Sequence, residues 1–249
     1  MAERITSSQN SLLQHIRRLQ TSRAYREECG EFVADGFKLL EEACKWYPHL
    51  KTVVISEGET LPALPSSVRV AKIPASLMQS LSSMKTPQGV IFTCALPKRE
   101  TAEIREGMLL LDRLQDPGNL GTILRTADAF DIPVLLTNGC ADPFSEKTVR
   151  ASMGAVFRTV PQRAELSDVL RICREKEIRI TATALSECAA DLRQADIRND
   201  LVVIGSEGQG ICQRLLEASD RQLIIPMQPR CESLNAAVAA ALVMWKMKY

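Results

Sequence analysis

The chain has 249 residues, of which 45% are hydrophobic and 24% charged, proportions typical of a globular protein with one or two domains. Its formal net charge of +1 excludes an overall basic field, so any binding of nucleic acid must depend on local patches. No apolar run approaches the ~20 residues of a membrane span, and the first residues lack the apolar core of a signal peptide, so we expect no membrane partner.

The eight cysteines and two histidines argue against a metal centre. No two cysteines lie within four residues of each other, so the spacing of a zinc site or a C-x-x-C motif is absent. We therefore predict no metal, and we interpret the cysteines as reduced, mostly buried thiols of a cytoplasmic protein.

Residues 1–94 alternate between helical and strand patterns. Within 10–20, the apolar residues follow a helical period. Helices are also predicted over 38–46 and 77–84, and strands over 32–35, 51–56, 68–73 and 90–94. These elements predict a small α/β domain.

Four arginines gather on and after the first predicted helix: Arg17, Arg18, Arg23 and Arg26. Such a group is most often a solvated helix face. The alternative is a patch that contacts the phosphates of a nucleic acid.

A charged stretch at 95–107, with Pro97 and Gly107 near its ends, predicts a linker between two domains. Strands then alternate with helices up to the C-terminus. Strands are predicted at 108–111, 133–137, 179–184, 201–205 and 223–225, and helices at 120–130, 146–156, 165–177 and 236–245. This alternation predicts a mostly parallel sheet with helices on both faces over 108–249.

Three polar loops follow strands of this second domain. In the first, 116–121, two glycines allow close backbone approach, Asn119 can cap the next helix, and Arg125 falls in its second turn. The second, 205–210, has the order G-x-x-G-x-G, the reverse of the dinucleotide fingerprint, and no P-loop motif is present. In the third, 226–235, Ser233 is the predicted N-cap of a helix that is apolar all round.

Each loop alone has an ordinary explanation, but together they resemble the three ordered motifs of the SpoU (TrmH-like) branch of the SPOUT RNA methyltransferases. The motifs are Asp116-Pro117-Gly118-Asn119-Leu120-Gly121 with Arg125, Gly205-Ser206-Glu207-Gly208 with Gly210, and Ile225-Pro226-Met227 with Glu232-Ser233-Leu234-Asn235. The stretch 145–155 also resembles the family, and residues 5–94 resemble, less specifically, its RNA-binding extension. Pro229, Asp131 and Asp35 depart from the usual pattern.

The resemblance implies an S-adenosylmethionine-dependent methylation of a ribose 2′-hydroxyl in ribosomal RNA, most simply 23S rRNA, or in tRNA, and not in DNA. It also implies a C-terminal trefoil knot, which pattern analysis would not propose because knots are rare. A homodimer through the C-terminal helix is expected as well. The implied cofactor-binding residues are Gly205, Ile225, Met227, Ser233 and Leu234.

The resemblance also supplies candidate catalytic residues: Asn119, Arg125, Glu207, Ser233 and Asn235. A guanidinium stays protonated in proteins, so we interpret Arg125 as a clamp on the RNA phosphate and a stabiliser of the alkoxide rather than as a base. We expect Glu207 to hold Arg125 or a loop amide. The predicted RNA contacts are Arg17, Arg18, Arg23, Arg26 and Arg150.

Two other functions are compatible with the same residues. The first is a non-catalytic RNA- or ribosome-binding protein that keeps the knotted fold, against which the joint presence of the five candidate residues speaks. The second is a small-molecule methyltransferase, which the N-terminal arginines and the additional domain disfavour.

Overall fold

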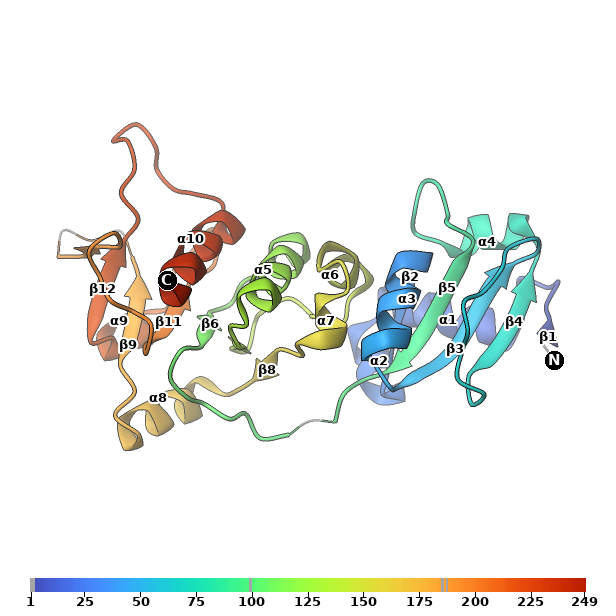
Figure 1. Ribbon diagram of the computed structural model, residues 1–249, viewed down its shortest axis with the longest axis horizontal. Coiled ribbons are helices and arrows are strands. Elements are labelled where there is room, and N and C mark those ends of the chain that lie inside the picture. Colours follow the sequence, from blue (N-terminus) through green and yellow to red (C-terminus); the bar gives the residue numbers. More distant parts are fainter. Residues whose placement is uncertain (1–2, 99, 185, 187) are drawn as a thin grey trace. The chain divides into compact units, whose positions relative to one another are not determined.

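A computed structural model describes residues 3–98, 100–184, 186 and 188–249. The chain forms two compact units (Figure 1). The first contains residues 1–98 and 144–158, and the second contains 99–143 and 159–249. Residues 1–2 of the expected first domain and residue 99 of the expected linker lie outside the described residues.

The first unit is a mixed sheet covered by helices. Its strands are β1 (Glu3–Arg4), β2 (Glu31–Asp35), β3 (Leu50–Ser56), β4 (Arg69–Ile73) and β5 (Val90–Ala95). Its helices are α1 (Ser11–Thr21), α2 (Arg23–Cys29), α3 (Phe37–Trp46), α4 (Ala75–Leu81), α6 (Glu146–Ala151) and α7 (Ala155–Arg158). The strand order is β1-β4-β3-β5-β2, with β5 antiparallel to both neighbours. All of the predicted strands and helices of residues 1–94 are present, and α4 begins two residues early.

Alternation along β2 explains why this sheet buries both faces. Phe32 and Ala34 join one hydrophobic cluster, and Val33 joins another, because successive side chains of a strand point to opposite faces. The first cluster also contains Val149 and Phe157, from α6 and α7. The segment 144–158 therefore completes the core of the first unit, although its place in the sequence predicted that it belongs to the second.

The second unit is built on a parallel sheet. Its strands are β6 (Leu109–Leu111), β7 (Val134–Leu136), β8 (Gln162–Arg163), β9 (Ile180–Thr183), β10 (Ala190–Asp191), β11 (Leu201–Ile204) and β12 (Arg221–Ile224). Its helices are α5 (Pro117–Phe130), α8 (Leu166–Glu175), α9 (Gln213–Ala218) and α10 (Ala236–Lys248). The strand order is β10-β12-β9-β11-β6-β7-β8, and every pairing in it is parallel.

Helices cover both faces of this sheet, as the sequence predicts. On β6, Leu109 and Leu111 pack into the cluster formed with α5 and α10, whereas Leu110 packs into the cluster formed with α8 and α9. β6 and β11 lie at the centre of the sheet, with Leu110 opposite Val203. The loops that follow these two neighbouring strands are therefore held side by side on a rigid base.

Three helix boundaries differ from the prediction. α5 begins at Pro117, and the predicted helix over 146–156 is interrupted, because Met153 and Gly154 both have positive φ. α10 is capped by Asn235, whose side chain accepts hydrogen bonds from the backbone N–H groups of Ala237 and Val238. The prediction that Ser233 is the N-cap is wrong, because the chain stays irregular until Asn235.

None of the helices in the described part of the chain combines the length and apolar character needed to cross a membrane. Within the same residues, no group of three His, Cys, Asp or Glu side chains could hold a metal ion.

Candidate functional site

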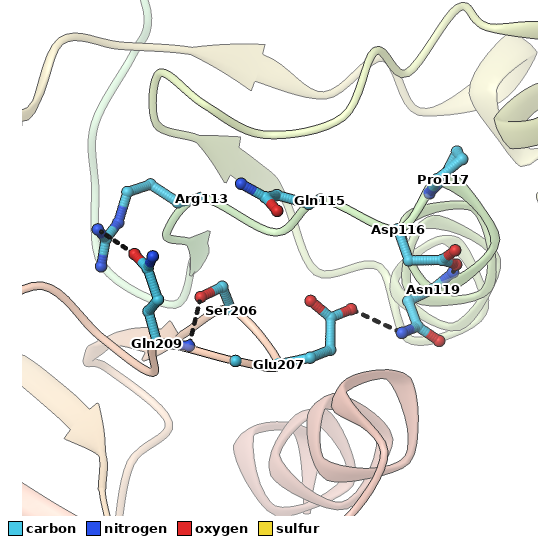
Figure 2. A pocket seen from close by; sticks show the side chains of 9 residues that line it. Arg113, Gln115, Asp116, Pro117, Asn119, Ser206, Glu207 and Gln209 are labelled. Atoms are coloured by element: carbon cyan, nitrogen blue, oxygen red, sulfur yellow. Dashed lines mark hydrogen bonds between the residues drawn. The ribbon is translucent and has the colours of Figure 1, made fainter.

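A polar cavity of about 560 Å³ lies between the loops that follow β6 and β11 (Figure 2). It is lined by Arg113, Gln115, Asp116, Pro117, Asn119, Ser206, Glu207, Gly208 and Gln209. Both loops leave the carboxyl ends of parallel strands, which is where open α/β sheets bind ligands.

The N-terminus of α5 forms one wall of the cavity. Asp116 is the N-cap, and its carboxylate accepts a hydrogen bond from the backbone N–H of Asn119 at 2.8 Å. Pro117 occupies the first turn, where its missing N–H costs nothing. The prediction that Asn119 caps this helix is therefore wrong. The side chain of Asn119 is instead free for a contact across the cavity.

The loop 205–210 forms the facing wall. It folds back on itself, because Ser206 and Gly210 exchange two backbone hydrogen bonds of 3.1 and 3.0 Å. A Cβ atom at Gly205 would lie 2.3 Å from the carbonyl carbon of Gly210 and 2.4 Å from the nitrogen of Ile211. Only glycine fits at this position, so the tight turn of the loop depends on Gly205.

A chain of side-chain amides joins three segments that are far apart in the sequence. Asn119 donates through Nδ2 to the carboxylate of Glu207 at 2.7 Å, and Asn235 donates through Nδ2 to Oδ1 of Asn119 at 3.0 Å. Figure 2 shows Glu207 and Asn119 facing each other across the cavity. The three loops identified in the sequence thus meet here through predicted catalytic residues. Glu207 holds the side-chain amide of Asn119, not the guanidinium of Arg125.

A buried carboxylate ties the two loops beside the cavity together. Asp112, the residue after β6, is only 1% exposed. It accepts hydrogen bonds from the backbone N–H of Cys212 at 2.8 Å and from the hydroxyl of Thr137 at 3.1 Å. Since Cys212 lies two residues after the end of the 205–210 loop, Asp112 links the segment after β6 to the segment after β11.

We expect Asp112→Ala to destabilise the protein by about 3 kcal/mol, because two donors lose a charged acceptor in a buried place. Asp112→Asn keeps the shape and one acceptor oxygen and should cost about half as much. Urea denaturation of the two variants and the wild type measures both losses. Equal stability of all three proteins would show that Asp112 does not anchor the loop.

Arg125 takes no part in this hydrogen-bonded network. It is exposed on α5, about two turns after the helix begins and not in the second turn, and it makes no hydrogen bond or ion pair with any described residue. A contact between Arg125 and Glu207 is thus absent from the described part of the structure. A role for Arg125 would require a partner that comes from outside this chain.

The predicted cofactor residues fall in two groups. Gly205 directly precedes the cavity wall at Ser206. The others lie in the long loop between β12 and α10, which projects from the sheet in Figure 1 and does not line the cavity. They are Ile225, Met227, Ser233 and Leu234, of which Ile225 packs against the core and Ser233 and Leu234 are exposed.

Two of the arginines predicted to contact RNA are engaged within the first unit. Arg26 is 5% exposed, and its guanidinium donates to the carbonyl of Leu19. It is a buried structural residue and cannot reach a phosphate, which corrects its place in the predicted patch. Arg23 is exposed and pairs with Glu27 one turn later at 3.1 Å.

The other three arginines keep part of their charge accessible. The guanidinium of Arg18 lies 3.7 Å from the ring centroid of Tyr25, and Arg17 donates to the carbonyl of Ser8 at 3.0 Å. The side chain of Arg150, from α6, is 39% exposed and lies 3.4 Å from the hydroxyl of Ser83. All three are at least partly exposed, and their contact with RNA stays a prediction.

Sequence reasoning missed four residues: Arg113, Gln115 and Gln209, which line the cavity, and Asp112, which ties its two loops together. A positional signal existed, because all four lie in the loops after β6 and β11. Nothing in the sequence distinguished them from ordinary loop residues. Arg113 in particular has a positive φ of 54°, a conformation that only the structure reveals.

A parallel sheet with a polar cavity at the carboxyl ends of its central strands defines a class of α/β protein, the class in which ligands bind at that edge of the sheet. Residues 107–245 match the SpoU rRNA Methylase family, and residues 10–91 match the MRM3-like substrate binding domain. The chain therefore belongs to the SpoU rRNA methylase family.

Individual proteins of known sequence or structure are similar to this chain over nearly its whole length. The chain is 30% identical to the 23S rRNA (guanosine(2553)-2′-O)-methyltransferase RlmP of Bacillus subtilis, with 99% of each chain covered. An AdoMet-bound rRNA methyltransferase from Sinorhizobium meliloti superposes with a TM-score of 0.86 at 29% identity, covering 99% of this chain and 97% of that one. The SpoU methyltransferase AviRb from Streptomyces viridochromogenes, solved in complex with AdoMet, superposes with a TM-score of 0.82 at 25% identity. The match covers 96% of this chain and 97% of that one.

Proposed function

We propose that this protein transfers a methyl group from S-adenosylmethionine to a ribose 2′-hydroxyl of ribosomal RNA, with 23S rRNA as the first candidate. The observation that carries the proposal is the hydrogen-bonded chain Asn235–Asn119–Glu207 at the cavity. It unites one residue from each of the three family motifs. The named methyltransferases that resemble the chain from end to end support the same activity.

The described residues suit this cofactor. S-adenosylmethionine supplies an electrophilic methyl group, and the chain must orient it in line with the acceptor oxygen. A close backbone turn such as the one at Gly205 can contact an adenosine without intervening side chains. We assign Gly205, Ile225, Met227, Ser233 and Leu234 to the cofactor on this basis and on the family pattern.

The remaining polar residues act on the acceptor. A ribose hydroxyl is a weak acid, so its developing negative charge needs a fixed cation or a donor nearby. We assign the contact with an RNA phosphate, and the supply of that cation, to Arg125, which is exposed and has no partner among the described residues. Asn119, Glu207, Ser233 and Asn235 hold the loops and the ribose in position.

The decisive experiment compares 2′-O-methylation across rRNA and tRNA from cells with and without the gene. We expect one ribosomal position to lose its methyl group. Titration calorimetry with S-adenosylmethionine should show binding by the purified protein. Unchanged methylation together with no cofactor binding at millimolar concentration would favour the alternative, a non-catalytic RNA- or ribosome-binding protein.

The family pattern also leads us to propose a trefoil knot formed by the loops at 205–210 and 225–235, and a homodimer in the cytoplasm. The support for the dimer is the outer face of α10. Four large apolar residues, Val238, Leu242, Trp245 and Tyr249, are between 44% and 70% exposed. Their spacing places them in one stripe along the helix, and an apolar stripe of this kind is typical of a protein interface.

We expect Leu242→Glu to convert the dimer into a monomer, because it places a charge in the middle of this stripe. Light scattering coupled to size-exclusion chromatography measures the mass. Lys248→Glu, which changes charge at an exposed position of the same helix outside the stripe, is the control and should leave the mass unchanged. A wild-type protein that is monomeric at micromolar concentration would contradict the proposed homodimer.

A further inference from the structure

The polar cavity carries its charges at separate ends. Its acidic residues, Asp116 and Glu207, lie at the end near the start of α5 and accept hydrogen bonds from Asn119. Arg113 and Gln209 lie together at the other end, as Figure 2 shows. Arg113 is the one basic residue among the described residues that line the cavity.

The backbone of Arg113 is held in an unusual conformation. Its φ of 54° lies in the left-handed region that favours glycine, and its N–H donates to the hydroxyl of Thr137 at 3.1 Å. Gly139 makes room for the side chain, because a Cβ there would lie 3.2 Å from Cγ of Arg113. A large side chain kept in a strained conformation at a ligand cavity is a reason to look for a function.

The guanidinium of Arg113 is only partly used by the protein. Its Nε lies 3.4 Å from a carboxylate oxygen of Asp112, and its Nη1 donates to Oε1 of Gln209 at 3.2 Å. The contact orients the amide of Gln209 through its oxygen and leaves its NH₂ group as a donor. No described residue accepts from Nη2 of Arg113. The pair therefore presents several N–H donors to the cavity, the arrangement that binds a phosphate.

We propose that Arg113, positioned by Gln209, binds the phosphodiester next to the target nucleotide, with the ribose at the Glu207–Asn119 end. This inference rests on the proposed function. Carboxylate and amide groups accept from and donate to ribose hydroxyls. The guanidinium of Arg113, although it also pairs with the buried Asp112, keeps N–H donors for a phosphate, so the polarity of the cavity matches that of a nucleotide. Arg113 is thus a substrate-binding residue that the three family motifs do not include.

The test uses the full-length protein and an unmodified Bacillus subtilis 23S rRNA transcript. Arg113→Met removes the charge but keeps an unbranched side chain over Gly139. We expect its affinity for the transcript to fall about tenfold at low salt. The slope of log affinity against log salt concentration should decrease in magnitude by about 0.7–0.9, which corresponds to one lost phosphate contact. The affinity for S-adenosylmethionine should stay within about twofold of wild type.

Two further variants separate binding from structure. Arg113→Gly relaxes the backbone and should lose RNA affinity without lowering the melting temperature. If Arg113 served only to stabilise the fold, this substitution would lower the melting temperature. Arg214→Met, at an exposed position of α9 outside the cavity, is the matched control and should keep the wild-type salt slope.

The outcomes distinguish this inference from the proposed function. An active wild type with unchanged RNA affinity and salt slope in Arg113→Met would overturn the role of Arg113 alone. Loss of cofactor affinity instead would mean that the anion bound is the carboxylate of the cofactor, and would also overturn it. A wild type that neither methylates nor binds the transcript would overturn the proposed function together with this inference.

Discussion

Arg125→Ala is expected to lower the rate of RNA methylation by a hundredfold or more, equivalent to about 3 kcal/mol, the usual cost of one preorganised electrostatic contact. The exposed position of Arg125 on α5, without a partner among the described residues, means that its loss leaves the fold intact. Cofactor affinity should therefore change little. Single-turnover kinetics with saturating RNA measures the rate, and calorimetry measures cofactor binding.

Arg125→Lys separates a clamp from a base. Lysine keeps the charge but lacks the planar fork, so a clamp should stay impaired at every pH. A lysine that acts as a base should recover activity as the pH rises toward ~10. Arg174→Ala, at an exposed position of α8, is the control for loss of surface charge. Full activity in Arg125→Ala would leave this arginine an ordinary helix-surface residue.

Gly205→Ala is expected to abolish cofactor binding, with a loss of affinity of about a hundredfold or more. The added Cβ would lie 2.3–2.6 Å from backbone atoms of Gly210 and Ile211, which cannot move without opening the loop. Overpacking of this kind costs about 1–3 kcal/mol in stability as well. Calorimetry and thermal melts on the purified variant measure the two effects.

The same loop provides the control. A Cβ at Gly208 would meet no atom within 4 Å. Gly208→Ala should therefore retain stability and cofactor affinity, although both variants add a single methyl group. If Gly205→Ala binds the cofactor as the wild type does, the adenosine does not depend on the tight turn of this loop.

The periodicity of the sequence was sufficient for most of the elements and for the parallel sheet. Three strands of the second unit, β6, β7 and β11, are apolar along their whole length, and β6 and β11 bury both faces in the structure. Helix starts were less predictable where several residues could serve as caps. Ser233 and Asn235 are both good N-caps, and their position relative to the core, which the sequence does not contain, selects Asn235. At α5, Asp116 followed by Pro117 is a helix-start signal in the sequence itself, and the structure begins the helix there.

The site was predictable in its components and not in its geometry. The family motifs supplied Asn119, Glu207 and Asn235, but their mutual hydrogen bonds depend on how three distant loops are brought together. The burial of Arg26 could not be predicted, because an arginine on an amphipathic helix is usually solvated. Asp112 and Arg113 were missed because a buried acceptor and a positive φ are properties of the folded chain.

The contribution of residues 144–158 to the first unit has a consequence for how the protein is made. The polypeptide passes between the units after residues 98, 143 and 158, so no single cut separates them. During translation, the ribosome releases Val149 and Phe157 only after β6, α5 and β7 of the second unit have been synthesised. Until then the hydrophobic core on this face of the N-terminal sheet is incomplete, and Phe32 and its neighbours are exposed in the nascent chain. The first unit can thus complete its fold only after part of the second unit has been synthesised. A chain truncated at residue 98 would expose the same apolar face of the N-terminal sheet.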